Sequence, residues 1–177
     1  MSKKKFENEK VFLSEIPEFE RIETNKLEKE YLKVIYANLF IVFSLSSIAL
    51  LISILSFEMI NEGYIFSIGL AFYFLIWLLI LIYYLASFKK RSYSFREHDV
   101  VYKYGVIYQT AVLIPFNRIQ HIALHQGIFS RMYGLASLQF YTAGGSTTDI
   151  NIKGLKLETA QKFKNFVSEK IEKIDKN

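Results

Sequence analysis

Apolar residues are concentrated in two long stretches in the first half of the chain. The segment from Val34 to Phe57 contains no charged residue, and neither does the segment from Tyr64 to Phe88. At about 1.5 Å of rise per residue, roughly 24 helical residues cross the ~30 Å hydrocarbon core of a bilayer with some tilt. The pattern therefore predicts a transmembrane hairpin over residues 34–88, with spans 34–57 and 64–88, rather than two buried core helices.

Small residues recur at helical spacing in both spans. Such residues allow two helices to approach closely in lipid, where no hydrophobic driving force favours their contact. Packing within the hairpin is the favoured interpretation, and dimerisation through the same faces is the alternative. The residues are Ser46, Ala49, Ser53 and Ser56 in the first span and Gly63, Ser67 and Ala71 in the second.

After Arg91 the apolar residues alternate with polar ones in short runs, which is typical of half-buried strands. The tail from Leu157 to Ile174 changes to a helical period, with one apolar face that must dock on the sheet because an isolated helix of this length is marginal in water. We therefore predict an antiparallel α+β domain over residues 92–177. The predicted strands are Tyr93–Phe95, Val100–Tyr104, Ile107–Phe116, Arg118–Gln126, Leu135–Thr142 and 149–152.

The basic residues around the spans predict the membrane topology. The loop between the spans, Glu58–Gly63, has no Lys or Arg, whereas basic residues flank the other end of each span. The positive-inside rule then places both termini, including an N-terminal segment over residues 1–33, in the cytoplasm. We expect the first twenty residues to be weakly ordered. The flanking basic residues are Lys26, Lys29, Lys33, Lys89, Lys90 and Arg91.

The net charge of +5 does not indicate nucleic-acid binding. The 22 Lys and Arg residues are mixed with 17 Asp and Glu, and no basic stripe with interleaved aromatics is present. The chain has no cysteine, which excludes a disulfide framework and thiol chemistry.

The sequence offers no constellation typical of an enzyme. His121 and His125 are four residues apart, but they lie in a predicted strand without a third ligand nearby, so no metal site is predicted. The run from Thr142 to Ser146 is rich in glycine, yet it lacks the Lys-Ser/Thr of a phosphate loop and is interpreted as a turn. We predict neither catalysis nor a cofactor.

Three runs carry a resemblance to a known family: Ile114–His121, Arg131–Leu138 and Thr142 to Gly145. Together with the two spans before them, they resemble the bacterial PH-like membrane proteins of the YdbS type. The resemblance implies a PH-like barrel of about seven antiparallel strands capped by a C-terminal helix, on a two-span anchor in a bacterial plasma membrane. It implies no reaction, and this sequence has one PH-like unit where some relatives have several.

Arg118, Gln120 and Arg131 lie in or beside these runs and are the candidate partner-binding residues, since guanidinium groups suit bidentate recognition. The alternative is that they fix loop geometry in the domain. The leading functional hypothesis is a non-catalytic module that binds a membrane or cytoplasmic protein, or a second copy of itself. The alternative is a domain that responds to anionic lipid, although the acidic turn Glu97–Asp99 disfavours inositide recognition. Transport is disfavoured because the spans contain no ionisable Asp, Glu, Lys, Arg or His.

Overall fold

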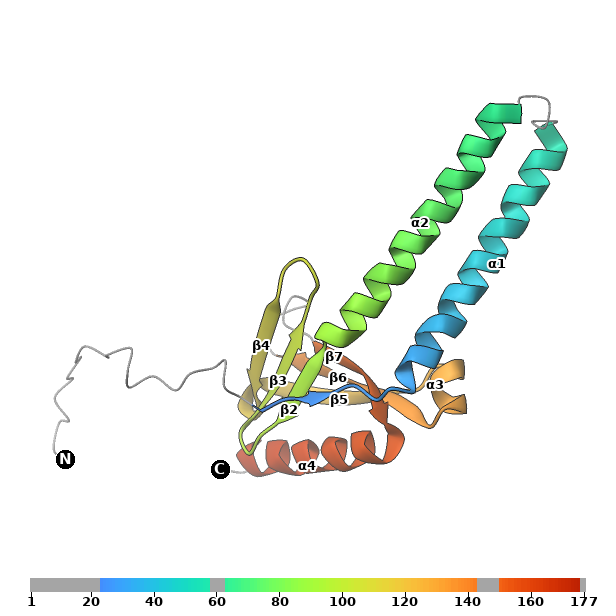
Figure 1. Cartoon of the computed structure of the whole chain (residues 1–177). Coiled ribbons are helices and arrows are strands. Elements are labelled where there is room, and N and C mark those ends of the chain that lie inside the picture. Colours follow the sequence, from blue (N-terminus) through green and yellow to red (C-terminus); the bar gives the residue numbers. More distant parts are fainter. Residues whose placement is uncertain (1–22, 58–62, 143–149, 176–177) are drawn as a thin grey trace, which may run out of the picture.

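The computed structural model of the protein describes residues 23–57, 63–142 and 150–175 (Figure 1). Three predicted features lie outside these residues: the weak order of the first twenty residues, most of the acidic loop between the spans, and the glycine turn after Thr142.

Two long helices, α1 (Tyr31–Phe57) and α2 (Gly63–Lys90), form the hairpin in Figure 1. They contain 27 and 28 residues. Each is therefore about 40 Å long and exceeds the ~30 Å hydrocarbon core of a bilayer. In each helix, the most apolar 18-residue window contains no residue that is buried inside the protein. A core helix of a soluble domain would be mostly buried, so the predicted pair of membrane spans is confirmed.

An aromatic cluster joins the two spans. The ring of Phe43 on α1 lies 5.2 Å from that of Trp77 on α2, edge to face, and 6.1 Å from that of Tyr73. The Tyr73 hydroxyl lies 2.8 Å from the hydroxyls of both Ser46 and Ser47. Of the small residues predicted to pack the hairpin, Ser46 is therefore at the contact, whereas Ala49, Ser67 and Ala71 are exposed. The contact accounts for the position of Trp77 in the middle of its span.

Seven strands form two antiparallel sheets in the part of the chain that the structure describes. The sheet orders are β1-β2-β3-β4 and β5-β6-β7. The prediction of about seven antiparallel strands with a C-terminal helix is confirmed, but the two sheets do not close into one barrel. The strands are β1 (Asn25–Lys26), β2 (Ser92–Phe95), β3 (Asp99–Tyr104), β4 (Thr110–Pro115), β5 (Ile119–His125), β6 (Leu135–Thr142) and β7 (Ile150–Lys156).

The two sheets and the terminal helix α4 (Leu157–Asp175) bury one apolar core. Leu138 and Phe140 of β6 are fully buried at its centre. Val167 of α4 is also fully buried, and the ring of Phe163 stacks on Phe95 with the centroids 3.7 Å apart. The predicted docking of the amphipathic helix on the sheet is confirmed.

The structure differs from the predicted elements in three places. β1 precedes the spans and pairs with β2, which follows them. A short helix, α3 (Ile128–Met132), lies between β5 and β6. β4 begins at Thr110 rather than at Ile107, because Gly105 adopts a φ of 109° and the chain turns there instead of continuing the strand.

The base of the hairpin is packed into the domain. Leu27, just before α1, is 4% exposed and belongs to the domain core. The amide of Glu28 donates a hydrogen bond to the carbonyl oxygen of Gly154 in β7, over 3.0 Å. Tyr31 covers that glycine and lies with its ring 6.5 Å from that of Phe88, near the end of α2. The spans are therefore fixed to the domain through side-chain packing as well as through the backbone.

Candidate functional site

One row of side chains crosses the four-stranded sheet from edge to edge. The register pairs Lys26 of β1 with Ser92 of β2, Ser92 with Lys103 of β3, and Lys103 with Ala111 of β4. Side chains that are directly opposite on antiparallel strands share one face of the sheet. The pairing therefore places two lysines on one face, with a small residue between them and another beside them.

The neighbouring row lies on the opposite face and belongs to the core. It runs from Tyr93 through Tyr102 to Val112. Tyr93 and Tyr102 are both buried, and burial raises the pKa of each phenol above its ordinary value. Both tyrosines therefore stay neutral at physiological pH. The alternation of serine and aromatic residues in β2 thus separates the cationic face from the core face. β3 departs from this alternation, because the fully buried Val101 lies on the same face as Lys103.

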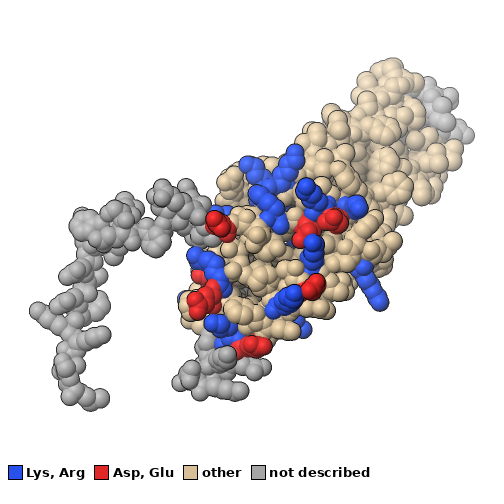
Figure 2. Space-filling view, turned by 60° about the horizontal axis from the view of Figure 1, so that its bottom comes forward, with Lys and Arg blue, Asp and Glu red and all other residues tan. Residues whose placement is uncertain are grey.

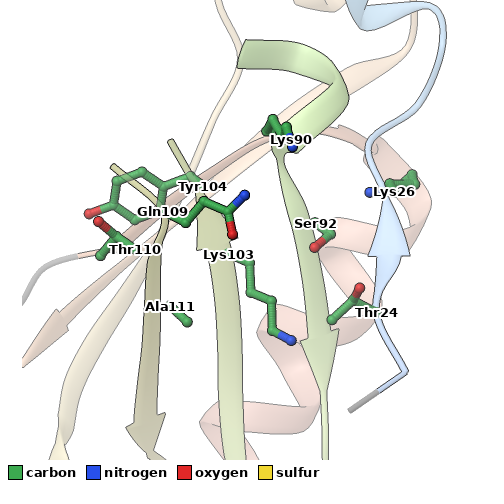
Figure 3. A pocket seen from close by; sticks show the side chains of 9 residues that line it. All are labelled: Thr24, Lys26, Lys90, Ser92, Lys103, Tyr104, Gln109, Thr110 and Ala111. Atoms are coloured by element: carbon green, nitrogen blue, oxygen red, sulfur yellow. The ribbon is translucent and has the colours of Figure 1, made fainter. Parts of the chain in front are cut away.

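Ser92 and Ala111, the small residues of the lysine-containing row, leave a hollow of about 590 Å³ on that face of the sheet. It is open to solvent and lies beside the end of α2, which contributes Lys90. In the view of Figure 3, the side chains of Lys26, Lys90 and Lys103 lie around the hydroxyl groups of Ser92 and Thr24. Three amino groups from three different elements therefore surround one polar hollow.

The hollow is cationic. Three of its nine lining residues are lysines and none is acidic. The lining residues are Thr24, Lys26, Lys90, Ser92, Lys103, Tyr104, Gln109, Thr110 and Ala111. The Lys26 amino group donates a hydrogen bond to the Lys89 carbonyl oxygen, at 3.4 Å, which holds β1 against the last turn of α2. Lys89 and Lys90 both lie in that last turn, where cations offset the negative end of the helix dipole. Such a site is suited to a compact anion such as phosphate.

This cationic face differs from the far side of the domain. Figure 2 turns the bottom of Figure 1 forward, and there Lys and Arg are interspersed with Asp and Glu over the domain, while the apolar length of the two spans is tan. On α4, for example, the Lys162 amino group lies 2.8 Å from the Glu158 carboxylate. That contact lowers the pKa of the exposed Glu158 carboxyl. Mixed charges of this kind give no site for an anion.

The residues predicted from sequence to bind a partner are not brought together. Arg118 ends the short 3-10 helix η4 (Phe116–Arg118), Gln120 lies on β5, and Arg131 lies on α3. All three are exposed. The two arginines lie beyond opposite ends of β5, a strand of seven residues. At about 3.3 Å per residue, β5 is roughly 20 Å long, so a small ligand at one end of this strand does not reach the other end.

Neither arginine has a hydrogen bond from its side chain, or an ion pair, to another described residue. Their predicted role in binding a partner therefore remains a prediction. His121 and His125 are both exposed, and the His121 ring stacks on Tyr141 with the centroids 4.1 Å apart. Among the described residues, no group of three or more His, Cys, Asp and Glu is placed to hold a metal ion.

The lysines of the hollow carry no signal in the sequence that joins them. Lys26 and Lys90 flank the spans as the positive-inside rule expects, and Lys103 is one polar residue in β3. The information that joins them is the pairing of β1 with β2 across the entire hairpin. A two-residue strand has no periodicity of its own, so its pairing leaves no local signal in the sequence.

The sequence is similar to a known protein family and to a curated transmembrane protein. The family described as "Bacterial PH domain" matches residues 36–171, which include the first span except for its start, the whole second span and most of the domain. A curated relative, the UPF0699 transmembrane protein YdbS of Bacillus subtilis (strain 168), is 30% identical over 76 residues. That alignment covers 43% of this chain and 46% of the relative, so the chain spans about half the length of the relative it matches. No solved structure matches.

The family match and the hairpin together establish the class of the protein. The match covers more than three quarters of the chain, and the relative is named as a transmembrane protein. The two apolar helices are long enough to cross a membrane. The chain is therefore a two-span membrane protein that belongs to the bacterial PH domain family.

Proposed function

We propose that this protein is a non-catalytic, membrane-anchored module whose PH-like domain binds the phosphate group of anionic phospholipids at the cytoplasmic membrane surface. The observation that carries the proposal is the row of Lys26, Ser92 and Lys103 beside Lys90 at the end of a span. The geometry thus favours the lipid-responsive alternative over a protein partner.

The position of the hollow supports a ligand that comes from the bilayer. Lys90 is the last residue of α2, and a helix about 40 Å long extends beyond a hydrocarbon core of about 30 Å into the headgroup region. Lysines at this depth each gain on the order of 1 kcal/mol from anionic headgroups. A phospholipid phosphate is therefore the most abundant anion within reach of the three amino groups.

We further propose that the domain faces the cytoplasm, because Lys and Arg flank the domain ends of both spans and are absent from the loop at their other end. The chain has no native cysteine, so single cysteines at Asn61 and at Gln161 of α4 report the two sides. In intact cells, a membrane-impermeant maleimide is expected to label residue 61 and to spare residue 161 until the cells are permeabilised. Labelling of residue 161 alone would reverse the orientation.

Lipid binding is tested on the detergent-solubilised full chain, titrated with short-chain phosphatidylglycerol and with short-chain phosphatidylcholine as the uncharged reference. Replacing Lys26, Lys90 and Lys103 with Gln removes the three charges of the hollow. At about 1 kcal/mol each, the affinity for phosphatidylglycerol is expected to fall roughly a hundredfold. Binding is followed by the rise in the thermal unfolding midpoint, because a ligand that binds only the folded state stabilises it.

The matched control removes the same total charge elsewhere, with Gln at Lys153, Lys162 and Lys170, which lie on β7 and α4. The control chain is expected to bind phosphatidylglycerol almost as the wild type does. Equal weakening in both triple variants would mean that the lipid responds to net charge alone, and the assignment of the hollow would fail. The assignment of the hollow would also fail if the variant with Gln at Lys26, Lys90 and Lys103 bound phosphatidylglycerol as tightly as the wild type does.

The second candidate function is binding of a protein partner at Arg118, Gln120 and Arg131. It is favoured by the exposure of all three side chains and by the lack of described partners for the two guanidinium groups. Its signature differs from that of lipid binding. A partner that co-purifies with the wild type and is lost on Arg118→Glu or Arg131→Glu, while lipid affinity is unchanged, would support this function.

A further inference from the structure

Two small apolar protrusions stand on the surface of the domain. The first is the tip of the β3–β4 hairpin, where Ile107 and Tyr108 are 81% and 84% exposed. The second is α3, where Ile128 and Met132 are 81% and 71% exposed. Apart from the spans themselves, these are the most exposed large apolar side chains of the described residues.

Both protrusions lie on the side of the domain from which the spans emerge. Figure 1 shows the β3–β4 tip and α3 beside the bases of α2 and α1, with α4 on the opposite side. Tyr104 and Gln109, which flank the tip, line the same hollow as Lys90 at the end of α2. Near α3, the amino group of Lys33 on α1 lies 5.5 Å from the centroid of the Tyr133 ring. The two protrusions therefore flank the hairpin at its base.

The composition of the tip is unusual for a turn in water. Turns favour Gly, Pro, Asn, Asp and Ser, yet this one carries Val106, Ile107 and Tyr108 in sequence. Its backbone is constrained, because a Cβ atom at Gly105 would collide with the carbonyl oxygen of Tyr108. The turn thus holds its apolar residues outward, where the domain itself does not cover them.

We propose that the β3–β4 tip and α3 insert into the bilayer leaflet beside the domain, one on each side of the hairpin. The argument for lipid as the occupant is continuity, because both protrusions adjoin helices that pass into the same bilayer. Isoleucine and methionine suit the acyl-chain boundary, and tyrosine suits the headgroup level. Two insertions in addition to the hairpin hold the domain against the membrane with the lysine hollow beside the headgroups.

This inference concerns apolar contact and does not depend on lipid binding by the hollow. It is expected to hold in bilayers of pure phosphatidylcholine, where no anionic headgroup is present. The failure of either proposal therefore leaves the other intact.

The test places single cysteines in the full chain at Tyr108 and at Met132, with Gln161 on α4 as the aqueous control and Leu79 on α2 as the bilayer reference. The absence of native cysteine makes each label unique. After labelling with an environment-sensitive fluorophore, the proteins are reconstituted in phosphatidylcholine vesicles. Emission at positions 108 and 132 is expected to shift to shorter wavelength and to be quenched by lipids that carry a nitroxide on the acyl chain, whereas position 161 is unaffected.

Labels at 108 and 132 that are as aqueous as the label at 161 would overturn the proposal. Blue-shifted emission that lipid nitroxides do not quench, and that disappears when the protein is diluted in lipid, would also overturn the proposal. It would indicate that the protrusions contact a second copy of the protein. All labelled positions are exposed, and circular dichroism of each variant checks that the fold is retained. Replacing Ile107 and Ile128 with Asp in the labelled chains is expected to abolish the quenching at both positions.

Discussion

Replacing Gly154 with Ala is expected to destabilise the protein by about 2–5 kcal/mol, because two separate costs add. Gly154 has a φ of +73°, a conformation that L-residues adopt at a cost of about 1–2 kcal/mol. Its new Cβ atom would also lie 2.6 Å from Cγ and 2.9 Å from Cβ of Tyr31. Because Tyr31 begins α1, relieving this overlap requires the span to move relative to the sheet. Pulse proteolysis of the detergent-solubilised chain in urea measures the loss.

Gly134 supplies the matched control for this substitution. Its φ is +64°, but a Cβ atom there would meet nothing within 4 Å. Gly134→Ala is therefore expected to incur only the conformational cost, about 1–2 kcal/mol. If the two variants lost the same stability, the contact between Tyr31 and Gly154 would not be a constraint on the junction.

Replacing Leu27 with Ala is expected to destabilise the domain by about 2–5 kcal/mol, which is typical of Leu→Ala changes in a packed core. Leu27 precedes the membrane spans in sequence, yet it is 4% exposed among core residues contributed by the rest of the domain. Leu113→Ala on β4 is the control, because that side chain is 39% exposed and leaves a much smaller cavity. The same proteolysis assay compares them. An equal and small effect of both changes would exclude Leu27 from the core.

The elements with a strong repeating pattern were predictable from sequence. The spans follow from uninterrupted apolar stretches, β6 from an approximate alternation of apolar and polar residues, and α4 from a helical apolar face. Predicted and observed bounds agree for β6, and α4 starts at the predicted residue. β1 and α3 could not be predicted in this way, since two and five residues are too few to show a period.

The candidate site was less predictable than the fold. Arg118, Gln120 and Arg131 are candidates because they lie in or beside the runs that carry the family resemblance, and such local runs do not define the distances between these side chains. The hollow depends instead on register. A shift of one residue in the pairing of β1 would move Lys26 to the core face, because successive side chains alternate between the two faces. The register of β1 is set by tertiary contacts between residues that precede and residues that follow the hairpin in the sequence.

The pairing of β1 with β2 also has a consequence for how the protein is made. Asn25 pairs with Tyr93, and both membrane spans lie between them in the sequence. During synthesis, β1 therefore has no partner until the whole hairpin has left the ribosome. If only one span crossed the bilayer, β1 and β2 would be on opposite sides, and the four-stranded sheet would lack its first strand and Leu27 its place in the core. Completion of the sheet thus requires the two ends of the hairpin to lie on the same side of the bilayer, and a chain with a single inserted span cannot meet this requirement.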